Sequence, residues 1–315
     1  MVSIIITLYN KQNTIERAIQ SALKQTYHNC EIIVIDDCST DNSPQICAKY
    51  GDKIRVIKSD KNRGLPYSRQ IGIKHAQGQF ITFIDADDYL DVKSIKRCIE
   101  KQKNTDADIV QMKISRRIDK LGISIPFRSK YDITKALDAC LYNEHLFPVQ
   151  CWGKLYKTEL LKTIHQIEHK GFWGEDRIFN IPILNSNPAI AVADNAKYNY
   201  SWGGITSSNF NIEALQEYKQ VYKLKHDWAI ANGYEHHILS MQKELVALLK
   251  YHVRHLINSC SMNGAGVINW LKNELSLPFW SSFDAKLDAK TIYNSEYKSI
   301  TRKLKKEISK ILTYF

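Results

Sequence analysis

Short apolar runs alternate with amphipathic stretches along the first 84 residues. Runs at 2–8, 31–35, 54–57 and 80–84 are rich in Ile and Val, which predicts buried β-strands. Between the first two runs, Ile15, Ala18, Ile19 and Ala22 recur at the spacing of one helix face. Because strands alternate with helices, we expect βαβ units and an α/β fold with a mostly parallel, Rossmann-like sheet.

Turn-forming residues delimit the helix that precedes the fourth apolar run. Gly64-Leu65-Pro66 resembles a helix start, since proline is well tolerated in the first helical turn. The helix is expected to run to about Ala76, with Gly78 as its C-terminal stop.

The pattern becomes helical after Phe210. Ile238, Met241, Leu245 and Leu248 follow one another at intervals of three and four residues, as on one helix face. We therefore predict an α/β domain over residues 1–210 and a helical domain over 211–315, with a boundary near Asn211.

Charge and cysteine usage narrow the class of protein. The net charge of +11 and pI near 9.1 fit nucleic acid, an anionic membrane surface or phosphate-bearing substrates as partners. No aromatic-basic module for nucleic acid is recognisable, so we expect no nucleic-acid partner. The sequence has no apolar run of about 18 residues and no basic leader, and its seven cysteines form no CxxC pair. These features predict a cytoplasmic protein with reduced thiols.

Polar clusters follow the C-terminal ends of the predicted strands. Tyr9, Asp36 with Asp37, the Arg63-Gly64 loop, and Asp85 with Asp87 should therefore share one edge of a parallel sheet. Asp85 and Asp87 lie two residues apart, which in an extended segment places both carboxylates on one side. Carboxylates suit Mn²⁺ or Mg²⁺, so Asp87 is predicted to bind the metal directly and Asp85 to contact the ion or a ribose. The alternative is a turn with solvated acids.

Five segments together resemble family-2 inverting glycosyltransferases with the GT-A fold, of the type that builds bacterial surface glycans. The segments are 3–10, 31–41, Arg63-Gly64 with Ser68-Arg69, 85–88, and Glu175-Asp176. The resemblance implies a donor half over about 1–110 and an acceptor half over about 111–210. It also implies inverting transfer of a sugar from a UDP-sugar to a hydroxyl of a glycan or lipid-linked acceptor.

The donor side is expected to use the strand-end residues. Tyr9 can stack on the base, Asp37 can accept the N3–H of uracil, and Asp36 can hold the loop or the ribose. Arg69 can reach the base or the phosphates, although it also fits an exposed helical arginine. The full predicted donor set is Thr7, Leu8, Tyr9, Asn10, Asp36, Asp37, Arg63, Gly64, Arg69, Asp85, Ala86, Thr206 and Ser207.

The acceptor side is expected to hold the catalytic base. By resemblance, Asp176 takes the proton of the acceptor hydroxyl and Glu175 is its neighbour; the alternative is an acidic first helical turn stabilised by the helix dipole. The predicted acceptor residues are Trp152, Lys154, Phe172 and Trp173. Residues 198–208 stand where relatives carry a loop that closes on the diphosphate. That segment has no His or Arg, so the hydroxyls of Thr206 and Ser207 are expected to substitute.

The C-terminal segment forms a basic amphipathic pattern. Tyr297, Ile300, Leu304 and Ile308 lie on one stripe while lysines fill the other faces. This stripe fits packing on the helical domain, contact with a second subunit to form a homo-oligomer, or peripheral binding to the inner membrane. For the whole chain, the alternatives are a nucleotidyltransferase, whose glycine-rich triphosphate loop is missing, and an inactive nucleotide-sugar-binding scaffold protein.

Overall fold

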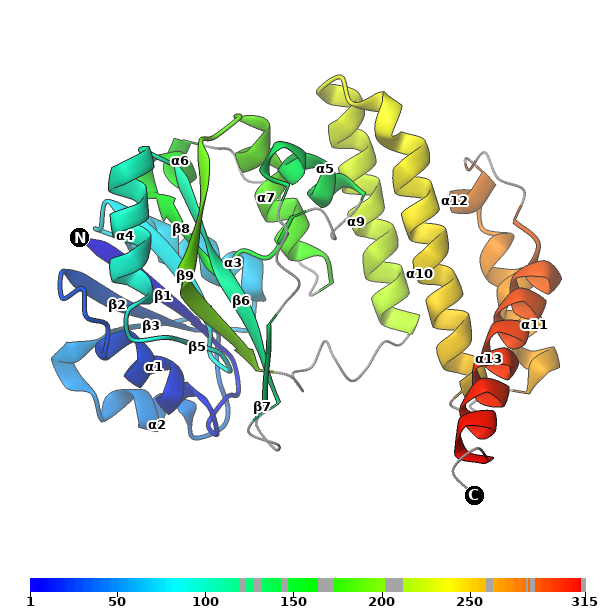
Figure 1. Cartoon of the computed structure of the whole chain (residues 1–315), viewed down its shortest axis with the longest axis horizontal. Coiled ribbons are helices and arrows are strands. Elements are labelled where there is room, and N and C mark those ends of the chain that lie inside the picture. Colours follow the sequence, from blue (N-terminus) through cyan, green and yellow to red (C-terminus); the bar gives the residue numbers. More distant parts are fainter. Residues whose placement is uncertain are drawn as a thin grey trace. The chain divides into compact units, whose positions relative to one another are not determined.

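The computed structural model describes residues 1–118, 123–126, 132–142, 147–163, 173–201, 212–258, 263–281, 283 and 287–312 (Figure 1). The chain divides into two compact units, Met1–Ser208 and Asn209–Phe315. The first unit contains the sheet and the second is helical. The division lies close to the boundary predicted near Asn211.

Four parallel strands form the first half of the sheet, as the sequence predicts. They are β1 (Val2–Leu8), β2 (Cys30–Asp36), β3 (Arg55–Lys58) and β4 (Phe80–Asp85), in the spatial order β3-β2-β1-β4. The register aligns Leu8 with Asp36 and Thr7 with Asp85. The polar ends of three strands therefore lie at one edge of the sheet.

Beyond β4 the sheet is mixed, which the sequence pattern does not predict. β8 (Lys154–Lys157) runs antiparallel between β4 and β6 (Ile109–Ile118), and β9 (Ile190–Ser201) runs parallel to β6. β5 (Tyr89–Leu90) pairs antiparallel with β9, and β7 (Ile123–Pro126) with β6. The prediction of a loop over 198–208 is wrong for residues 198–201, which belong to β9; residues 202–208 lie outside the described ones.

The described helices of this unit pack on the sheet and on one another. α1 (Ile15–Leu23) and α2 (Ser43–Ala48) touch each other, and α4 (Ser94–Thr105) packs against β6 and β9. α3 (Leu65–His75) touches α6 (Thr158–Thr163) and α7 (Glu175–Asn185), and α7 touches α5 (Ala136–Leu141). The described part also includes the 3₁₀ turns Gly51–Lys53 and Ile133–Lys135. Because the chain steps from β1 to β2 and β3 in one direction and then returns to β4 on the other side of β1, the topological switch point lies between β1 and β4.

Helix α3 approaches the central strand closely because it carries a glycine. A Cβ on Gly72 would lie 2.5 Å from Cγ2 of Ile5, so no other residue fits without displacing β1's side chain. Gly78 also serves close approach, since a Cβ there would lie 2.6 Å from the backbone nitrogen of Ser3. The prediction that Gly78 stops α3 is wrong, because the helix ends at His75 with Ala76 already extended.

The second unit consists of helices, as predicted. It contains α9 (Ile212–Ala231), a 3₁₀ turn (Glu235–His237), α10 (Ile238–Asn258), α11 (Gly264–Leu275), α12 (Pro278–Ser281) and α13 (Ala289–Leu312). α10 contacts α9, α11 and α13, and its buried face carries Met241, Leu245 and Leu249. Lys219 on α9 and Glu274 on α11 form a buried 2.7 Å ion pair, and the Glu274 carboxylate also accepts the indole N–H of Trp280.

The predicted C-terminal stripe begins at an exposed position. Among the described side chains of α13, Ala289, Ile292 and Glu296 are buried, whereas Tyr297 is 50% exposed. The side chains from residue 303 onward lie outside the described ones. Within the described part of the chain, no helix is long and apolar enough to cross a bilayer.

The Gly72–Ile5 contact predicts a non-additive pair of substitutions. Gly72→Ala should destabilise the sheet unit by about 1–3 kcal/mol through overpacking, and Ile5→Ala should cost about 2–5 kcal/mol through the cavity it leaves. In the double variant the new methyl group occupies part of that cavity, so the combined loss should be smaller than the sum by at least about 1 kcal/mol. Urea unfolding of the four proteins measures this coupling. Additive losses would show that α3 and β1 do not meet at this point.

Candidate active site

The end of β1 is tied to both of its neighbours at the switch point. The Thr7 hydroxyl donates to Asp85 Oδ1 at 3.0 Å, and the backbone N–H of Ala86 donates to the Thr7 carbonyl at 3.1 Å. On the other side, the Asp37 N–H donates to the Leu8 carbonyl at 2.8 Å. Thr7 and Leu8 are 3% and 1% exposed, so their side chains support the floor of the site.

Tyr9 and Asn10 continue from this floor in different ways. Asn10 adopts a left-handed backbone with φ of 50°, and its side-chain oxygen accepts the N–H groups of Thr40 and Asp41. This contact anchors the turn after β1 to the turn after β2. Tyr9 is 37% exposed, which leaves its ring available for stacking.

The Asp36-Asp37 pair holds two loops. Asp36 accepts the Ser39 N–H at 2.9 Å, and Asp37 accepts the N–H groups of Arg63 and Gly64 at 2.9 and 2.7 Å. Gly64 precedes α3 with φ of 85°, a conformation that glycine adopts without strain. The loop-holding role predicted for Asp36 is therefore shared with Asp37, whose carboxylate fixes the start of α3. The Arg63 side chain points elsewhere, to Asp60 and over the ring of Tyr67.

The acidic segment after β4 is a turn, and the prediction that it continues as an extended strand is wrong. β4 ends at Asp85, and the Asp88 N–H donates back to the Asp85 carbonyl at 2.8 Å. Asp88 is fully buried and accepts the Tyr198 hydroxyl at 2.7 Å and the Ser201 N–H at 2.8 Å. Burial and the nearby charges of Asp87 and Asp85 raise the pKa of Asp88 well above its usual value. Asp88 thus fastens this turn to the end of β9.

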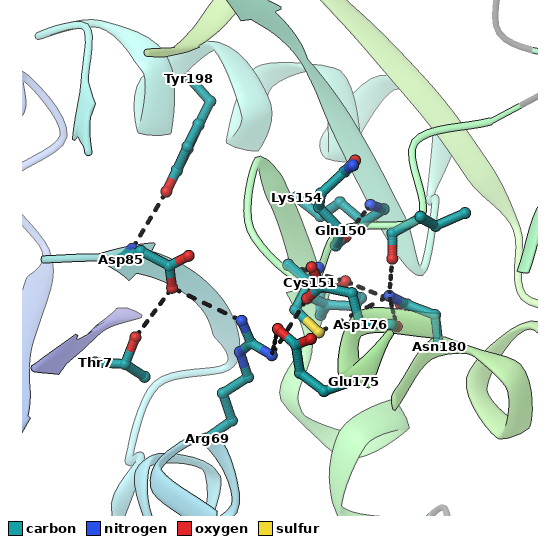
Figure 2. Close-up of polar contacts among 12 residues, drawn as sticks. Thr7, Arg69, Asp85, Gln150, Cys151, Lys154, Glu175, Asp176, Asn180 and Tyr198 are labelled. Carbon is teal, nitrogen blue, oxygen red and sulfur yellow. Dashed lines mark hydrogen bonds and ion pairs between the residues drawn. The ribbon is translucent and has the colours of Figure 1, made fainter. Parts of the chain in front are cut away.

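Arg69 lies at the centre of the site, as Figure 2 shows. Its guanidinium pairs with Asp176 at 3.2 Å, Glu175 at 3.6 Å and Asp85 at 3.7 Å. The side chain is 1% exposed, so the reading of Arg69 as an exposed helical arginine is wrong. One buried cation therefore joins the end of β4 to the start of α7.

The pKa values of Asp85 and Glu175 are raised in this cluster. Burial raises the pKa of Asp85 to about 6, against the lowering effect of Arg69. Burial and the charge of Asp176 raise the pKa of Glu175 well above its ordinary range. Like charges held close together disfavour ionisation, so the charge of Asp176 adds to the rise in the pKa values of Asp85 and Glu175, while Arg69 opposes it.

Glu175 and Asp176 begin α7, as predicted. Gly174 precedes them with φ of 76°, and the Cys151 N–H donates to Asp176 Oδ1 at 2.9 Å. Asn180, one turn further along α7, donates to the carbonyls of Val149 and Asp176. Asp176 remains 19% exposed at the side chain, whereas Glu175 is 10% exposed. Asp176 is therefore fixed on its buried side while still facing solvent.

The predicted acceptor residues differ in how buried they are. Lys154 is wrong as an acceptor contact, because it is 1% exposed and its ammonium donates to the carbonyls of Pro148 and Gln150. Burial lowers the pKa of Lys154 to about 8. Trp152 is 7% exposed and stacks on Tyr198 and Tyr200, at ring distances of 4.6 and 5.3 Å, so it is mainly a packing residue. Trp173 is half-buried beside Asp176 in sequence. Phe172, Thr206 and Ser207 lie outside the described residues.

A family model decides the identity of this site. Residues 3–164, about half of the 315-residue chain, match the model described as Glycosyl transferase family 2. The chain belongs to glycosyltransferase family 2. The matched residues include the switch point with Arg69 and the carboxylates after β4, and α7 joins this cluster through Arg69 from outside the matched range, so the cluster is the candidate active site of a glycosyltransferase.

Curated relatives of the chain are bacterial glycosyltransferases. The glycosyltransferase GlyG of Streptococcus pneumoniae is 24% identical over 278 residues, which cover 80% of this chain and 90% of GlyG. The poly(ribitol-phosphate) beta-N-acetylglucosaminyltransferase TarS of Staphylococcus aureus strain Mu50 is 30% identical over 204 residues, which cover 62% of this chain and 35% of TarS. This glycosyltransferase thus spans most of GlyG but about a third of TarS.

A solved structure supports the fold. A crystal structure of residues 1–349 of S. aureus TarS in complex with UDP-GlcNAc superposes with a TM-score of 0.56 at 18% identity. The match covers 95% of this chain and 92% of that one. The GT-A fold expected from the sequence is confirmed.

Several residues of this glycosyltransferase site are not predicted from the sequence. Lys11 pairs with Asp87 Oδ2 at 2.5 Å, and Arg17 donates to the Asp87 carbonyl at 2.6 Å. Tyr198 receives the Asp85 N–H at 3.2 Å while donating to Asp88. The position of Lys11 directly after the Tyr9-Asn10 turn was the available signal. Nothing local in the sequence links Tyr198 to a turn 110 residues earlier.

The carboxylates after β4 are suitable ligands for a divalent cation such as Mg²⁺ or Mn²⁺. Asp85 and Asp87 present oxygen ligands at the open edge of the sheet, and Asp87 is 24% exposed. Among the described residues no group of three or more His, Cys, Asp or Glu is arranged to hold a metal. Such a group is not needed where one or two carboxylates share the ion with substrate phosphates.

Removing Arg69 should destabilise the protein in a pH-dependent way. Arg69→Met leaves the buried Glu175 and the partly buried Asp85 and Asp176 without their cation, which should cost about 3–5 kcal/mol at pH 8. In the unfolded chain Asp85 and Glu175 titrate near pH 4, whereas burial raises the pKa values of both in the folded protein, and loss of the guanidinium should raise them further. Between these values the folded state binds more protons, so stability falls as pH rises and the loss should shrink at pH 5. Denaturant unfolding at both pH values measures the difference.

Two further variants test whether this pH dependence comes from the carboxylates around Arg69. Glu175→Gln combined with Arg69→Met removes one of the competing charges and should recover part of the stability at pH 8. Lys74→Met, at an exposed position on α3, should show no such pH dependence. An Arg69→Met loss that is equal at both pH values would mean that the cation does not balance these carboxylates.

Proposed function

We propose that this protein transfers a sugar from a UDP-sugar to a hydroxyl of a glycan or glycolipid acceptor, with inversion at the anomeric carbon. The observation that carries the proposal is the Arg69 cluster, which joins Asp85 at the donor edge to Asp176 at the start of α7. A single displacement requires a donor site and a base that face one another across the reacting carbon. Membership of glycosyltransferase family 2 supports the reaction class.

The donor is proposed to lie along the C-terminal ends of β1, β2 and β4. The exposed ring of Tyr9 offers a stacking surface for uracil, and Asp37, directly after β2, donates its N–H to the carbonyl of Leu8, the residue before Tyr9. The relative TarS is named as a beta-N-acetylglucosaminyltransferase and has been crystallised with UDP-GlcNAc. We therefore propose a UDP-hexose or UDP-N-acetylhexosamine as donor.

Asp176 is proposed to be the general base, with Glu175 as its neighbour. The Cys151 N–H and Arg69 orient the Asp176 carboxylate, and its partial exposure allows an acceptor hydroxyl to approach. Glu175 is more buried than Asp176, and burial raises its pKa well above its ordinary range, so Asp176 is the better placed of the two to meet an acceptor hydroxyl. Trp173 is the described aromatic residue best placed in sequence to contact an acceptor sugar.

Asp85 and Asp87 are proposed to hold Mn²⁺ or Mg²⁺ together with the donor diphosphate. When bound, the cation neutralises charge on the diphosphate as it leaves. Neighbouring residues hold these two aspartates in position. Thr7 and Tyr198 contact Asp85, and Lys11 and Arg17 contact Asp87.

The acceptor and location are proposed from the relatives and from charge. GlyG, TarS and the minor teichoic acid biosynthesis protein GgaB of Bacillus subtilis are bacterial proteins, and the last two are named for cell-surface polymers. A net charge of +11 suits a cytoplasmic enzyme that works on phosphate-bearing or lipid-linked acceptors at the inner membrane surface.

Replacing the proposed base should abolish turnover without abolishing donor binding. A panel of UDP-sugars is assayed for UDP release, both by transfer and by slow hydrolysis, since water can replace the acceptor. Asp176→Asn should lower the rate by about 10²–10⁴-fold because general base catalysis is lost. Its affinity for UDP, measured by calorimetry, should stay within a few-fold of the wild type. Asp52→Asn, on an exposed 3₁₀ turn, serves as the matched control. Near-normal turnover in Asp176→Asn would assign the base elsewhere.

Chelation should remove activity reversibly. EDTA should suppress UDP release, and Mn²⁺ or Mg²⁺ should restore it, because the diphosphate loses its neutralising partner without the cation. Asp87→Asn should require a higher metal concentration for the same rate. Full activity in EDTA would show that protein cations alone stabilise the leaving group.

A further inference from the structure

Lys11 forms an ion pair with the Asp87 carboxylate, which is also a proposed metal ligand. Its ammonium lies 2.5 Å from Asp87 Oδ2, and the two side chains are 25% and 24% exposed. Arg17, on α1, donates to the Asp87 main-chain carbonyl and to the Ser201 hydroxyl. Lys11 places a positive charge directly on a carboxylate oxygen that a divalent cation would use.

The backbone of Lys11 is fixed while its side chain extends into the site. Its N–H donates to the Ser43 hydroxyl at 3.0 Å, and its carbonyl accepts the N–H groups of Thr14 and Ile15. The next residue is also held, since the Gln12 N–H donates to Asp41 at 2.9 Å. A lysine has a flexible four-carbon stem, so its ammonium can move over several ångströms from a fixed anchor.

We propose that Lys11 is an internal counter-ion that competes with the divalent cation for Asp87 and transfers to the donor diphosphate when metal and donor bind together. This inference rests on the proposed function. An ammonium and a divalent cation cannot both occupy the same carboxylate oxygen at contact distance without strong repulsion. A diphosphate adds negative charge beside Asp87, which gives the displaced ammonium a new partner.

The exchange couples the two ligands. Without a nucleotide, a divalent cation must displace Lys11 and so binds weakly. With a nucleoside diphosphate present, the same ammonium stabilises the phosphates, so each ligand raises the affinity of the other by the same factor. Lys11 would thereby keep the metal site closed until a donor arrives, and the free enzyme would not accumulate bound metal.

The experiment is a titration with Mn²⁺, followed by electron paramagnetic resonance of the free ion, with and without UDP. Wild-type protein should bind Mn²⁺ weakly alone and more tightly with UDP. Lys11→Gln should bind Mn²⁺ about 5-fold more tightly than wild type in the absence of UDP, the change expected when a partly exposed ion pair is removed. The extra affinity that UDP gives to Mn²⁺ should shrink in the same variant.

Two further variants control for charge and packing. Lys11→Arg retains the positive charge and should behave like the wild type. Lys49→Gln removes one exposed lysine at the end of α2 and should leave both titrations unchanged. If Lys49→Gln changes Mn²⁺ binding as much as Lys11→Gln does, the change reflects the net charge of the protein, and the proposal is overturned.

The possible failures are distinguishable. If Mn²⁺ binds the wild type more tightly with UDP and Lys11→Gln does not alter its binding without UDP, the counter-ion role is overturned while the proposed metal site stands. If UDP binds but Mn²⁺ fails to bind in any variant, the metal part of the proposed function falls and the role of Lys11 falls with it. If neither UDP nor Mn²⁺ binds, the proposed donor is itself incorrect.

Discussion

The buried guanidinium of Arg69 is the interaction on which the candidate site depends. A cation with 1% exposure is stable only where negative charge surrounds it, and Asp85, Glu175 and Asp176 supply that charge. The carboxylates need the cation equally, since burial alone already raises the pKa values of Asp85 and Glu175. This mutual requirement brings the end of a parallel strand and the start of a later helix into one cluster.

The position of Arg69 follows from constraints on helix α3. Asp37 accepts two backbone N–H groups at the start of this helix, and Gly72 lets the helix lie directly on Ile5 of β1. Both contacts are made by residues that do not touch the reacting groups. They determine how deep the guanidinium lies and therefore which carboxylates it reaches.

A second set of contacts holds the acidic turn after β4 from the opposite direction. The Tyr198 hydroxyl bridges the Asp85 N–H and the Asp88 carboxylate, and the Ser201 N–H completes the binding of Asp88. With Asp88 buried in this way, Asp85 and Asp87 stay partly exposed, and Asp87 pairs with the Lys11 ammonium. The turn thus divides its three carboxylates among a cluster with Arg69, a pair with Lys11 and a structural anchor.

The sequence by itself determined the local elements and the reaction class. Apolar runs of β-branched residues predicted β1 to β4, and the rule that parallel strands end at one edge brought Tyr9, Asp37 and Asp85 together. The family motifs identified a glycosyltransferase, as the family model confirms. These features could be predicted because they depend on residues close together in the chain or on a general rule of sheet topology.

Only the tertiary structure decided which polar side chains serve the site and which support it. Lys154 and Trp152 resemble acceptor contacts in sequence, but a neighbouring turn of carbonyls and a pair of tyrosines bury them. Arg69 resembles a surface arginine, but carboxylates about 16 and 106 positions later surround it. The physical reason is that the energy of a charged group depends on its burial and on the charges within a few ångströms of it. Folding sets both of these, and the spacing of residues along the chain does not record them.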